Sequence, residues 1–449
     1  MTWVTDDNQA LLTDLYELTM AASYHRAGMN EPATFDLFVR DLPDNRNFLV
    51  SCGLEHALDY LGSVRFTQDS LDYLDSLEMF GDDFLSYLSD FSFSGEVDAI
   101  AEGEIVFACE PLLQVTAPLI EAQIVETFLL NCVMFQTMIA SKAARVALAC
   151  GNRSFVDFSP RRDHGADAAV KAARASYVGG ASATSNVLAG KLFGIDTSGT
   201  MAHSYVLAFE DEISAFREFV RDFPERSVLL IDTFDVEEGA RNAVTVGREM
   251  AAESGKLRAV RIDSGDLDSL SRSVRKILDE GGLQGTGIFV SGDLNEHKIK
   301  SLLDESVPVD AFGVGTEMGT STDAPALGSA YKLVQDARGP KMKLSTGKAT
   351  LPGRKQVFRF TTGGRFERDV IALRGEEIGS GVALLQRVMA GGRRTAPPEP
   401  LARLRERCAS ATSKLPEPLR ALERADEPYA VELSPELERL VAEMEQRGG

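Results

Sequence analysis

The sequence predicts an α/β protein built around an array of parallel strands, and three observations indicate this. Short apolar runs recur at intervals of roughly 20–45 residues between Arg153 and Val334, with helical patterns between them, which is typical of βα units. Nearly every run ends in small, charged or hydroxylic residues, and 44% of the chain is hydrophobic, enough for a large core. The runs are Ser154–Phe158, Thr200–Met201, Val228–Ile231, Ala259–Ile262, Ile288–Val290 and Val309–Val314.

We expect three regions along the chain. Its 449 residues exceed one ordinary domain of roughly 100–200 residues. An N-terminal α/β domain is expected over 1–118, a barrel-like α/β domain over 119–338, and a C-terminal region over 339–449. In the first region, polar and apolar residues alternate from Gly95 to Pro118, which predicts an antiparallel pair of strands.

Two segments outside the strand array also have clear patterns. The apolar stretch from Leu119 to Cys150 contains several charged residues, so it predicts a buried or interface helix and not a membrane span. The C-terminal region predicts a strand at Gln356–Phe360 and amphipathic helices at Leu401–Ala409 and Pro435–Gln446. It begins with a basic stretch that contains Lys341, Lys343, Lys348, Arg354, Lys355 and Arg359.

Composition narrows the class of protein. A formal charge of −21 disfavours general attraction to nucleic acid or to an anionic membrane, so anionic substrates need local basic groups. The five cysteines are scattered without a CxxC pair, which argues for a reducing compartment and against a disulfide framework. The N-terminal residues carry no secretory signal pattern. We therefore expect a cytoplasmic enzyme without membrane or nucleic-acid partners.

The residues that follow the predicted strands are the candidates for a site. In α/β barrels the active site lies at the carboxyl ends of the strands, often with a phosphate site from the late strands. Glycine, serine and aspartate at such positions also make turns and helix N-caps, but six polar loops in a row favour a shared site. The candidate side chains at these ends are Arg161, Arg162, His203, Asp232, Asp235, Arg261, Asp263, Asp266 and Thr316.

Each candidate type suits a particular ligand chemistry. Arginine binds carboxylate or phosphate with two parallel hydrogen bonds, and Arg162 is the alternative to Arg161 in this role. The backbone of Gly313 and Gly315 can hold a phosphate, although a plain tight turn is the commoner reason for such glycines. The four aspartates can bind ribose hydroxyls or position a Mg²⁺ that arrives with pyrophosphate.

His203 follows a predicted strand and is expected to face the same end of the array as the carboxylates. A single histidine is often only a core residue. Neutral imidazole beside a carboxylate is also a competent nucleophile or base near neutral pH, and we favour that function here.

Seven motifs follow one another along the chain: Thr13–Met20, Arg161–Arg162 with Gly165, Thr184–Gly190, Gly199–Ser204, Arg261–Asp266, Gly313–Thr316 and Pro352–Lys355. In this order, the set resembles the nicotinate phosphoribosyltransferase family over nearly the whole chain, from about Ala10 to Tyr429. One motif alone is moderately specific, but the ordered set is highly specific.

The resemblance implies a fold and an assembly. The fold would be the type II phosphoribosyltransferase fold, with an N-terminal α/β domain, an irregular α/β barrel, and a C-terminal part packing back on the first domain. The assembly would be a homodimer with active sites shared between subunits. Tyr16 would then reach the site of the partner subunit.

The resemblance also implies the reaction and the residue roles. The substrates would be nicotinate, phosphoribosyl pyrophosphate and ATP with Mg²⁺, and the enzyme would be an ATP-dependent ligase. His203 would become a phosphohistidine and Asp232 would orient its ring. Tyr16 and Arg161 would bracket the pyridine ring, and Arg261 would help hold nicotinate. Asp263 would meet ribose, and Thr316, with Gly313 and Gly315, would bind the phosphoribosyl phosphate.

Two positions depart from the commoner family pattern. Ser159 and Pro160 replace a glycine and a variable residue before the first arginine, and Phe234 replaces a tyrosine, so loop geometry is where differences are expected. The four-cysteine metal site of some relatives is absent, so no structural zinc is expected.

Three alternatives remain. A nicotinamide-using sibling usually carries lysine where this chain has Glu17. A quinolinate-type enzyme needs no phosphate-accepting histidine. An inactive relative that serves as a binding protein would not need the whole set of His203, Asp232 and the two arginines.

Overall fold

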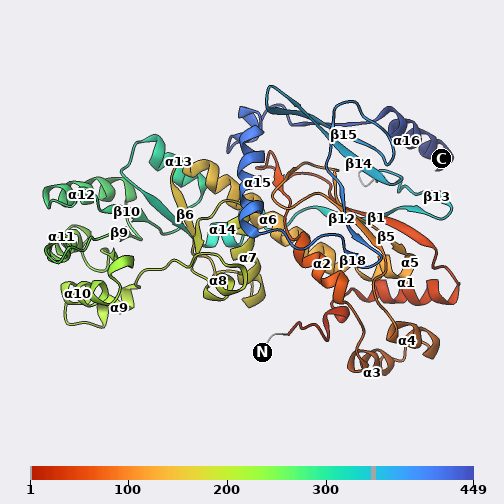
Figure 1. Cartoon of the computed structure of the whole chain (residues 1–449), viewed down its shortest axis with the longest axis horizontal. Helices are drawn as coiled ribbons and strands as arrows, with labels where there is room; N and C mark the ends of the chain where they lie inside the picture. Colours follow the sequence, from red (N-terminus) through yellow and green to blue (C-terminus); the bar gives the residue numbers. More distant parts are fainter. Residues whose placement is uncertain (1–2, 345–349, 449) are drawn as a thin grey trace. The chain divides into compact units, whose positions relative to one another are not determined.

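The structure, a computed structural model, describes residues 3–344 and 350–448, and the chain forms two compact units. The first unit contains Met1–Ser141 and Ala324–Gly449, and the second contains Lys142–Asp323. Figure 1 shows the elements of both units coloured along the sequence. Lys348 of the basic stretch lies outside the described residues.

The second unit is built on a parallel sheet, as the apolar runs predicted. Its strand order is β7-β6-β11-β10-β9-β8, with parallel pairing throughout and β7 and β8 at the two edges. The sheet is therefore open, in agreement with an irregular barrel. The strands are β6 (Ser154–Asp157), β7 (Ala183–Thr184), β8 (Val228–Leu230), β9 (Ala259–Ile262), β10 (Gly287–Val290) and β11 (Ala311–Val314).

Helices follow these strands and bury their apolar faces against them. Val260, Ile288 and Phe312 of the central strands are fully buried in one core, together with Val274 and Ile299 of the helices. The helices are α7 (Ala166–Val178), α8 (Val187–Phe193), α9 (His203–Leu207), α10 (Glu212–Asp222), α11 (Val236–Ala252), α12 (Leu267–Glu280), α13 (Glu296–Asp304) and α14 (Thr316–Gly319), with a 3-10 turn, η2 (Pro224–Arg226).

One expected strand is wrong. Residues 198–202 form no strand, although Thr200–Met201 was predicted as one, and the edge position beside β6 is taken by β7. Just before it, Thr197 makes an isolated parallel bridge with Thr184 of β7, and no ladder continues into the segment. Instead, the Thr200 hydroxyl accepts a hydrogen bond from Arg261 at 3.0 Å, so the segment helps to hold the Arg261 side chain at the carboxyl end of β9.

The first unit joins the two ends of the chain in one antiparallel sheet. Within its described residues, the sheet order is β13-β12-β1-β5-β3-β17-β18. Strand β17 of the expected C-terminal region pairs with β3, so that region packs back on the N-terminal domain as expected, and β12 pairs with β1. The strands are β1 (Pro32–Val39), β3 (Glu96–Ala99), β5 (Pro111–Pro118), β12 (Ser329–Asp336), β13 (Gly339–Pro340), β17 (Gln386–Ala390) and β18 (Arg393–Arg394).

Two smaller sheets complete the strands of the first unit. One has the order β16-β14-β15-β19 and the other pairs β2 with β4. The antiparallel pair expected in Gly95–Pro118 is present as β3 and β5. The further strands are β2 (Leu49–Val50), β4 (Ile105–Val106), β14 (Lys355–Thr362), β15 (Arg365–Leu373), β16 (Val382–Ala383) and β19 (Ala430–Leu433).

The helices of the first unit include both amphipathic helices expected near the C-terminus. These are α15 (Leu401–Lys414) and α16 (Pro435–Gly448). The others are α1 (Leu15–Arg26), α2 (Leu54–Ser63), α3 (Gln68–Ser76), α4 (Asp82–Ser89), α5 (Leu119–Ile124) and the start of α6 (Glu126–Cys150), with 3-10 turns η1 (Gln9–Leu11) and η3 (Glu417–Arg420). Within the described residues, no helix has the length and apolar character that crossing a membrane requires.

The unit boundaries differ from those expected at 118 and 338. Helix α5 and most of α6 belong to the first unit because α5 packs against β1 and β5. Strand β12 also belongs there because it pairs with β1 along six residues. The sequence pattern shows the helix and the strand, but not the partner against which each one packs.

Candidate active site

A cavity of about 370 Å³ lies at the carboxyl ends of the parallel strands in the second unit. Phe158 and Arg161 follow β6, Ser185 follows β7, and Arg261 and Asp263 come from the end of β9. The segment from Gly199 to His203 forms another part of the wall. The chain thus collects two arginines, a histidine and a carboxylate at the edge of the sheet where the sequence predicted a site.

Arg261 is the most firmly held of these side chains. It is 9% exposed, and its Nε donates to Ser291 Oγ at 2.8 Å. Its Nη1 donates to Thr200 Oγ1 at 3.0 Å and its Nη2 to Asp263 Oδ1 at 2.6 Å. The guanidinium carbon lies 5.3 Å from the ring centre of Phe158. Because guanidinium has five N–H donors and these contacts use three, the fixed group can still donate to a ligand.

Asp263 stays ionised beside this arginine. Burial disfavours its charge, but the Ser291 hydroxyl and the Arg261 guanidinium, with His203 nearby, hold the pKa of the Asp263 carboxyl below its usual value. Ser291 Oγ donates to Asp263 Oδ1 at 2.5 Å. The site therefore has an anchored cation and an anchored anion side by side.

His203 begins α9 and keeps a substantial part of its ring in contact with solvent, with 42% of the side chain exposed. Its Nδ1 lies 3.2 Å from Thr233 Oγ1, and its Nε2 lies 3.9 Å from Asp263 Oδ2. The ring is thus positioned on one edge by a hydroxyl and faces a carboxylate on the other. This arrangement suits an accessible nucleophile.

Asp232 binds the neighbouring loop. Its Oδ2 accepts hydrogen bonds from the Asp263 backbone N–H at 2.9 Å and from Ser264 Oγ at 2.8 Å. Its Oδ1 is buried without a hydrogen-bond partner among the described residues. The hydrogen bond of His203 goes to the next residue, Thr233, so the orientation of the ring by Asp232 stays a prediction.

Arg161 is the freer of the two arginines in the cavity wall. It lies on the exposed loop after β6, and its guanidinium makes no hydrogen bond or ion pair with any residue that the structure describes. Its cationic head is therefore available to an anionic ligand. Arg162, the alternative, is exposed and is not among the lining residues.

Strand β11 packs through Gly313 against Phe158 in the wall of the cavity. Gly313, Gly315 and Thr316 do not line it, but an added Cβ on Gly313 would lie 2.7 Å from the ring of Phe158. Gly313 therefore allows Phe158 to occupy the wall. Thr316 is exposed at the start of α14, at the same end of the sheet. Asp235 caps α11 by accepting from the Glu238 backbone at 2.9 Å, as the capping alternative predicted.

Tyr16 lies in the first unit, on α1, with 48% of its surface exposed. Burial and the carboxylates of Glu126 and Glu17 raise the pKa of its phenol, so the phenol is neutral. Burial also raises the pKa of Glu17 to about 7, against hydrogen bonds from Thr13 and Thr127. Tyr16, the residue expected to contact the pyridine ring, thus has an accessible aromatic ring, whereas the next residue, Glu17, is buried.

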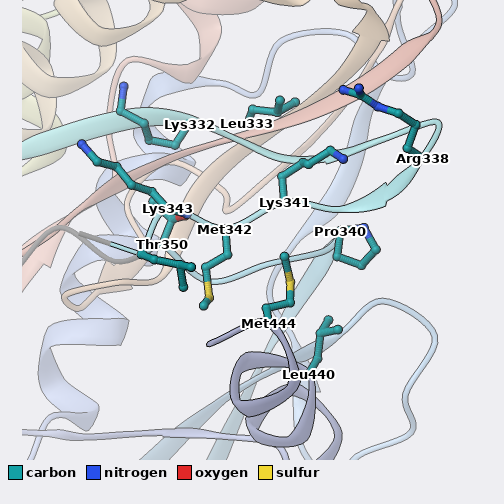
Figure 2. A pocket seen from close by; sticks show the side chains of 11 residues that line it. Lys332, Leu333, Arg338, Pro340, Lys341, Met342, Lys343, Thr350, Leu440 and Met444 are labelled. Atoms are coloured by element: carbon teal, nitrogen blue, oxygen red, sulfur yellow. The ribbon is translucent and has the colours of Figure 1, made fainter. Parts of the chain in front are cut away.

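A second cavity, of about 660 Å³, lies near the end of the sheet in the first unit and is lined by basic side chains (Figure 2). Lys332 pairs with Glu126 at 3.5 Å. Arg338 and Lys341 pair with Asp336 at 2.6 and 3.1 Å. Leu440 and Met444 of α16 line its other side. Because Glu126 contacts Lys332 and acts on Tyr16, this basic pocket and the Tyr16 ring belong to one neighbourhood.

Sequence reasoning missed four residues that shape the first cavity: Phe158, Thr200, Thr233 and Ser291. Ser291 had a usable signal, because it directly follows the predicted strand Ile288–Val290. The structure pairs Phe289 with Arg261, which puts Ser291 two residues further on the same face. Thr200 had none, since its role depends on a loop that reaches across to Arg261.

Comparison with known proteins gives one consistent result. Residues 11–134 match the family model described as the nicotinate phosphoribosyltransferase (NAPRTase) N-terminal domain. The chain is 44% identical to nicotinate phosphoribosyltransferase pncB2 of Mycobacterium tuberculosis, over 97% of this chain and 93% of that protein. It is 43% identical to the nicotinate phosphoribosyltransferase of Bacillus subtilis, over 83% and 78%. The crystal structure of human nicotinic acid phosphoribosyltransferase superposes with a TM-score of 0.85 at 28% identity, covering 96% of this chain and 99% of that one.

Proposed function

Because this chain belongs to the nicotinate phosphoribosyltransferase family, we propose that it joins nicotinate to the ribose 5-phosphate of phosphoribosyl pyrophosphate. The products are nicotinate mononucleotide and pyrophosphate, the first step in making NAD from nicotinate. The observation that carries this proposal is the cavity at the sheet edge, where Arg161 and Arg261 offer guanidinium groups to a small anion.

The cavity suits a flat aromatic acid. Phe158 offers an aromatic face, and Arg261 has N–H groups left over from its three protein contacts. A carboxylate accepts two parallel hydrogen bonds from such a group. We infer that Arg261 binds the carboxylate of nicotinate and that the second cation, Arg161, contacts the exposed side of the pyridine ring.

The reaction needs positioning more than proton transfer. The lone pair of the pyridine nitrogen forms the N–C1 bond of ribose while the C1–O bond to pyrophosphate breaks, and the electron pair leaves with pyrophosphate. The nitrogen loses no proton, so a general base is not required. Charge develops on the ribose ring as in glycoside hydrolysis, and the ionised Asp263 is suited to that charge and to the ribose hydroxyls.

ATP coupling is assigned to His203. An imidazole nitrogen attacks the γ-phosphorus of ATP, ADP leaves, and water later cleaves the phosphoramidate bond to release phosphate. The exposed ring, with Thr233 on one edge and Asp263 near the other, supports this role. Asp232 would act on the ring indirectly, by accepting hydrogen bonds from the Asp263 backbone N–H and the Ser264 hydroxyl.

Mg²⁺ is assigned to the substrates and not to a resident site. Within the described residues there is no cluster of three or more histidine, cysteine, aspartate or glutamate side chains suited to a metal ion. Mg²⁺ that arrives on pyrophosphate or ATP needs only one or two carboxylates. The candidates are Asp263, which lines the cavity, and Asp266, which lies three residues further along the same loop and is not a lining residue. Bound in this way, the ion would neutralise phosphate charge.

The homodimer with shared sites is also part of the proposal. Tyr16 and the basic pocket beside it are accessible in the first unit. In a dimer with shared sites, they would contact the substrates that are bound in the cavity of the partner subunit. Anionic pyrophosphate suits the lysines of this pocket, and a pyridine ring suits Tyr16.

The test of the proposed function is a product assay with labelled nicotinate, phosphoribosyl pyrophosphate, Mg²⁺ and ATP. We expect labelled nicotinate mononucleotide, formed faster with ATP than without it. Labelled nicotinamide is run in parallel. No product from nicotinate, or equally fast product from nicotinamide, would contradict the proposal.

A further inference from the structure

The loop that carries Arg161 contains a hydroxyl shared by two carboxyl groups. Ser159 Oγ lies 2.6 Å from Asp157 Oδ1 and 3.1 Å from Asp163 Oδ2. Ser159 is fully buried, and it stands where the family pattern commonly has glycine. The departure from the pattern therefore creates a polar contact that a glycine cannot make.

One hydrogen cannot serve both carboxyl groups. Asp157 is the better acceptor, because its oxygens also receive the Ser159 backbone N–H at 2.9 Å and Thr184 Oγ1 at 2.7 Å. The Ser159 hydroxyl hydrogen therefore goes to Asp157, since a hydroxyl has a single hydrogen. Asp163 can hydrogen-bond to Ser159 only if the Asp163 carboxyl brings its own proton.

The surroundings of Asp163 favour that proton. Its Oδ1 is buried without a hydrogen-bond partner among the described residues. Burial, with the charge of Asp157 added, raises the pKa of Asp163 to about 7. The other titratable groups of its loop and of the adjoining α14 and α7 are Arg161, Arg162, His164, Glu317, Arg174, Tyr177, and Asp167 paired with Lys171 at 2.5 Å.

Asp163 also touches the element that begins with Thr316. A Cβ on Gly319, the last residue of α14, would collide with Asp163 Oδ1 and with the Ser159 side chain. The missing side chain thus lets the Arg161 loop lie directly against α14. Asp163 thus stands where the Arg161 loop meets α14.

We propose that the protonated Asp163 carboxyl is a positioning residue that fastens the Arg161 loop to Ser159 and to α14. Loss of the proton leaves two carboxylates facing one hydroxyl, and the loop loosens. Nicotinate binding then weakens as the pH rises, because Arg161 loses its fixed place. This effect on nicotinate rests on the proposed function, whereas the loosening of the loop does not.

The sign of the pH effect follows from the raised pKa. A carboxyl group that is harder to ionise in the folded state contributes its stabilisation fully below the unfolded pKa, and loses it as the pH rises through the folded value. For Asp163 the stabilisation is therefore lost as the pH rises through about 7. The loop is therefore fastened in mildly acidic solution and loosened in mildly alkaline solution.

The kinetic test compares the wild type with Asp163→Asn, whose amide donates to Ser159 at every pH. From about pH 6 to pH 8.5 we expect the wild-type KM for nicotinate to rise at least about threefold beyond any rise in Asp163→Asn, with a smaller change in kcat. Asp167→Asn, which alters an exposed carboxylate on α7, should follow the wild type. The same rise in Asp163→Asn, or a raised KM at every pH, overturns the inference.

Hydrogen exchange tests the loop without relying on activity. After correction for the intrinsic rate, protection of the peptide that contains Ser159 and Arg162 should fall above about pH 7 in the wild type and stay constant in Asp163→Asn. If the protein transfers no phosphoribosyl group to nicotinate, the proposed function fails, but this exchange experiment still decides the inference. Equal protection of both proteins at all pH values overturns it.

Discussion

At the scale of single residues, the buried hydroxyl of Ser291 makes hydrogen bonds to two charged side chains of the cavity. Ser291 binds the guanidinium of Arg261 and the carboxylate of Asp263, so the cation and the anion keep a fixed spacing. Fixed charges stabilise a developing charge without reorganising during the reaction. We conclude that the network around Ser291 prepares the site before substrate arrives.

His203→Ala is the first prediction at this scale. Removal of the imidazole should abolish ATP hydrolysis and the labelling of the protein by the γ-phosphate of ATP. Slow transfer without ATP should survive, because Arg161, Arg261 and Asp263 remain. His297→Ala, which removes an exposed histidine on α13, is the matched control and should label as the wild type does. An acid-labile phosphate on His203→Ala would refute the assignment.

The sequence predicted the charged residues of the cavity better than their contacts. Arg161, Arg261, Asp263 and His203 were expected at strand ends, and all four line one cavity. The hydrogen bond of His203 to Thr233 was not expected, because the ring position depends on the loop before α9. Residue type and strand end are local properties, whereas a hydrogen-bond partner depends on the tertiary path of two loops.

At the scale of elements, the parallel strands were predictable because each is an apolar run bounded by polar residues. Five of the six runs are strands in the structure. The sixth, Thr200–Met201, is a loop, while the two-residue strand at Ala183–Thr184 lacked an apolar run long enough to notice. Short edge strands depend on pairing with a neighbour, which the sequence pattern does not contain.

Helices α6 and α13 are joined by a buried ion cluster, which gives the second prediction. Glu296 Oε2 lies 2.6 Å from Lys142 Nζ, and Glu296 Oε1 lies 2.9 Å from Arg145 Nε, with the Lys142 and Glu296 side chains at most 2% exposed. Lys142→Met should lower the free energy of unfolding by about 3 kcal/mol, because the buried carboxylate of Glu296 loses one of these two cationic partners.

Urea unfolding measures this change. The matched control is Lys300→Met, which removes an exposed lysine that pairs with Asp304 four residues away, and its effect should stay below about 0.5 kcal/mol. Equal effects of the two substitutions would show that the buried cluster adds nothing beyond a surface pair.

At the scale of the whole molecule, the proposed dimer predicts complementation. Tyr16→Ala and Arg161→Ala lie in different units of the chain and should each inactivate the homodimer. In a mixed dimer with shared sites, one site contains both wild-type residues. Mixing the two inactive proteins under conditions of subunit exchange should therefore restore up to about a quarter of the wild-type activity per subunit.

Sedimentation and labelled subunits provide the controls for this experiment. Exchange must be shown directly, with one variant carrying an affinity tag. A fully active monomer, or no recovered activity despite proven exchange, would contradict a site completed by Tyr16 of the partner subunit.

The acid preference of the enzyme tests the central claim most directly. Nicotinate carries a carboxylate and nicotinamide a neutral amide, and a charge-assisted hydrogen bond to guanidinium is worth roughly 1.5–3 kcal/mol. Replacing Arg261 with lysine keeps the charge but loses the planar fork. We therefore expect kcat/KM for nicotinate to fall about tenfold to a hundredfold, with little change for nicotinamide.

The decisive measurement is kcat/KM for both substrates in the wild type, in Arg261→Lys, and in Arg258→Lys as a matched control. Arg258 is an exposed arginine that pairs with Glu225 at 2.9 Å, so its replacement should leave both values unchanged. A selective loss of nicotinate use in Arg261→Lys is the predicted result. Equal losses for acid and amide would contradict recognition of the carboxylate by Arg261.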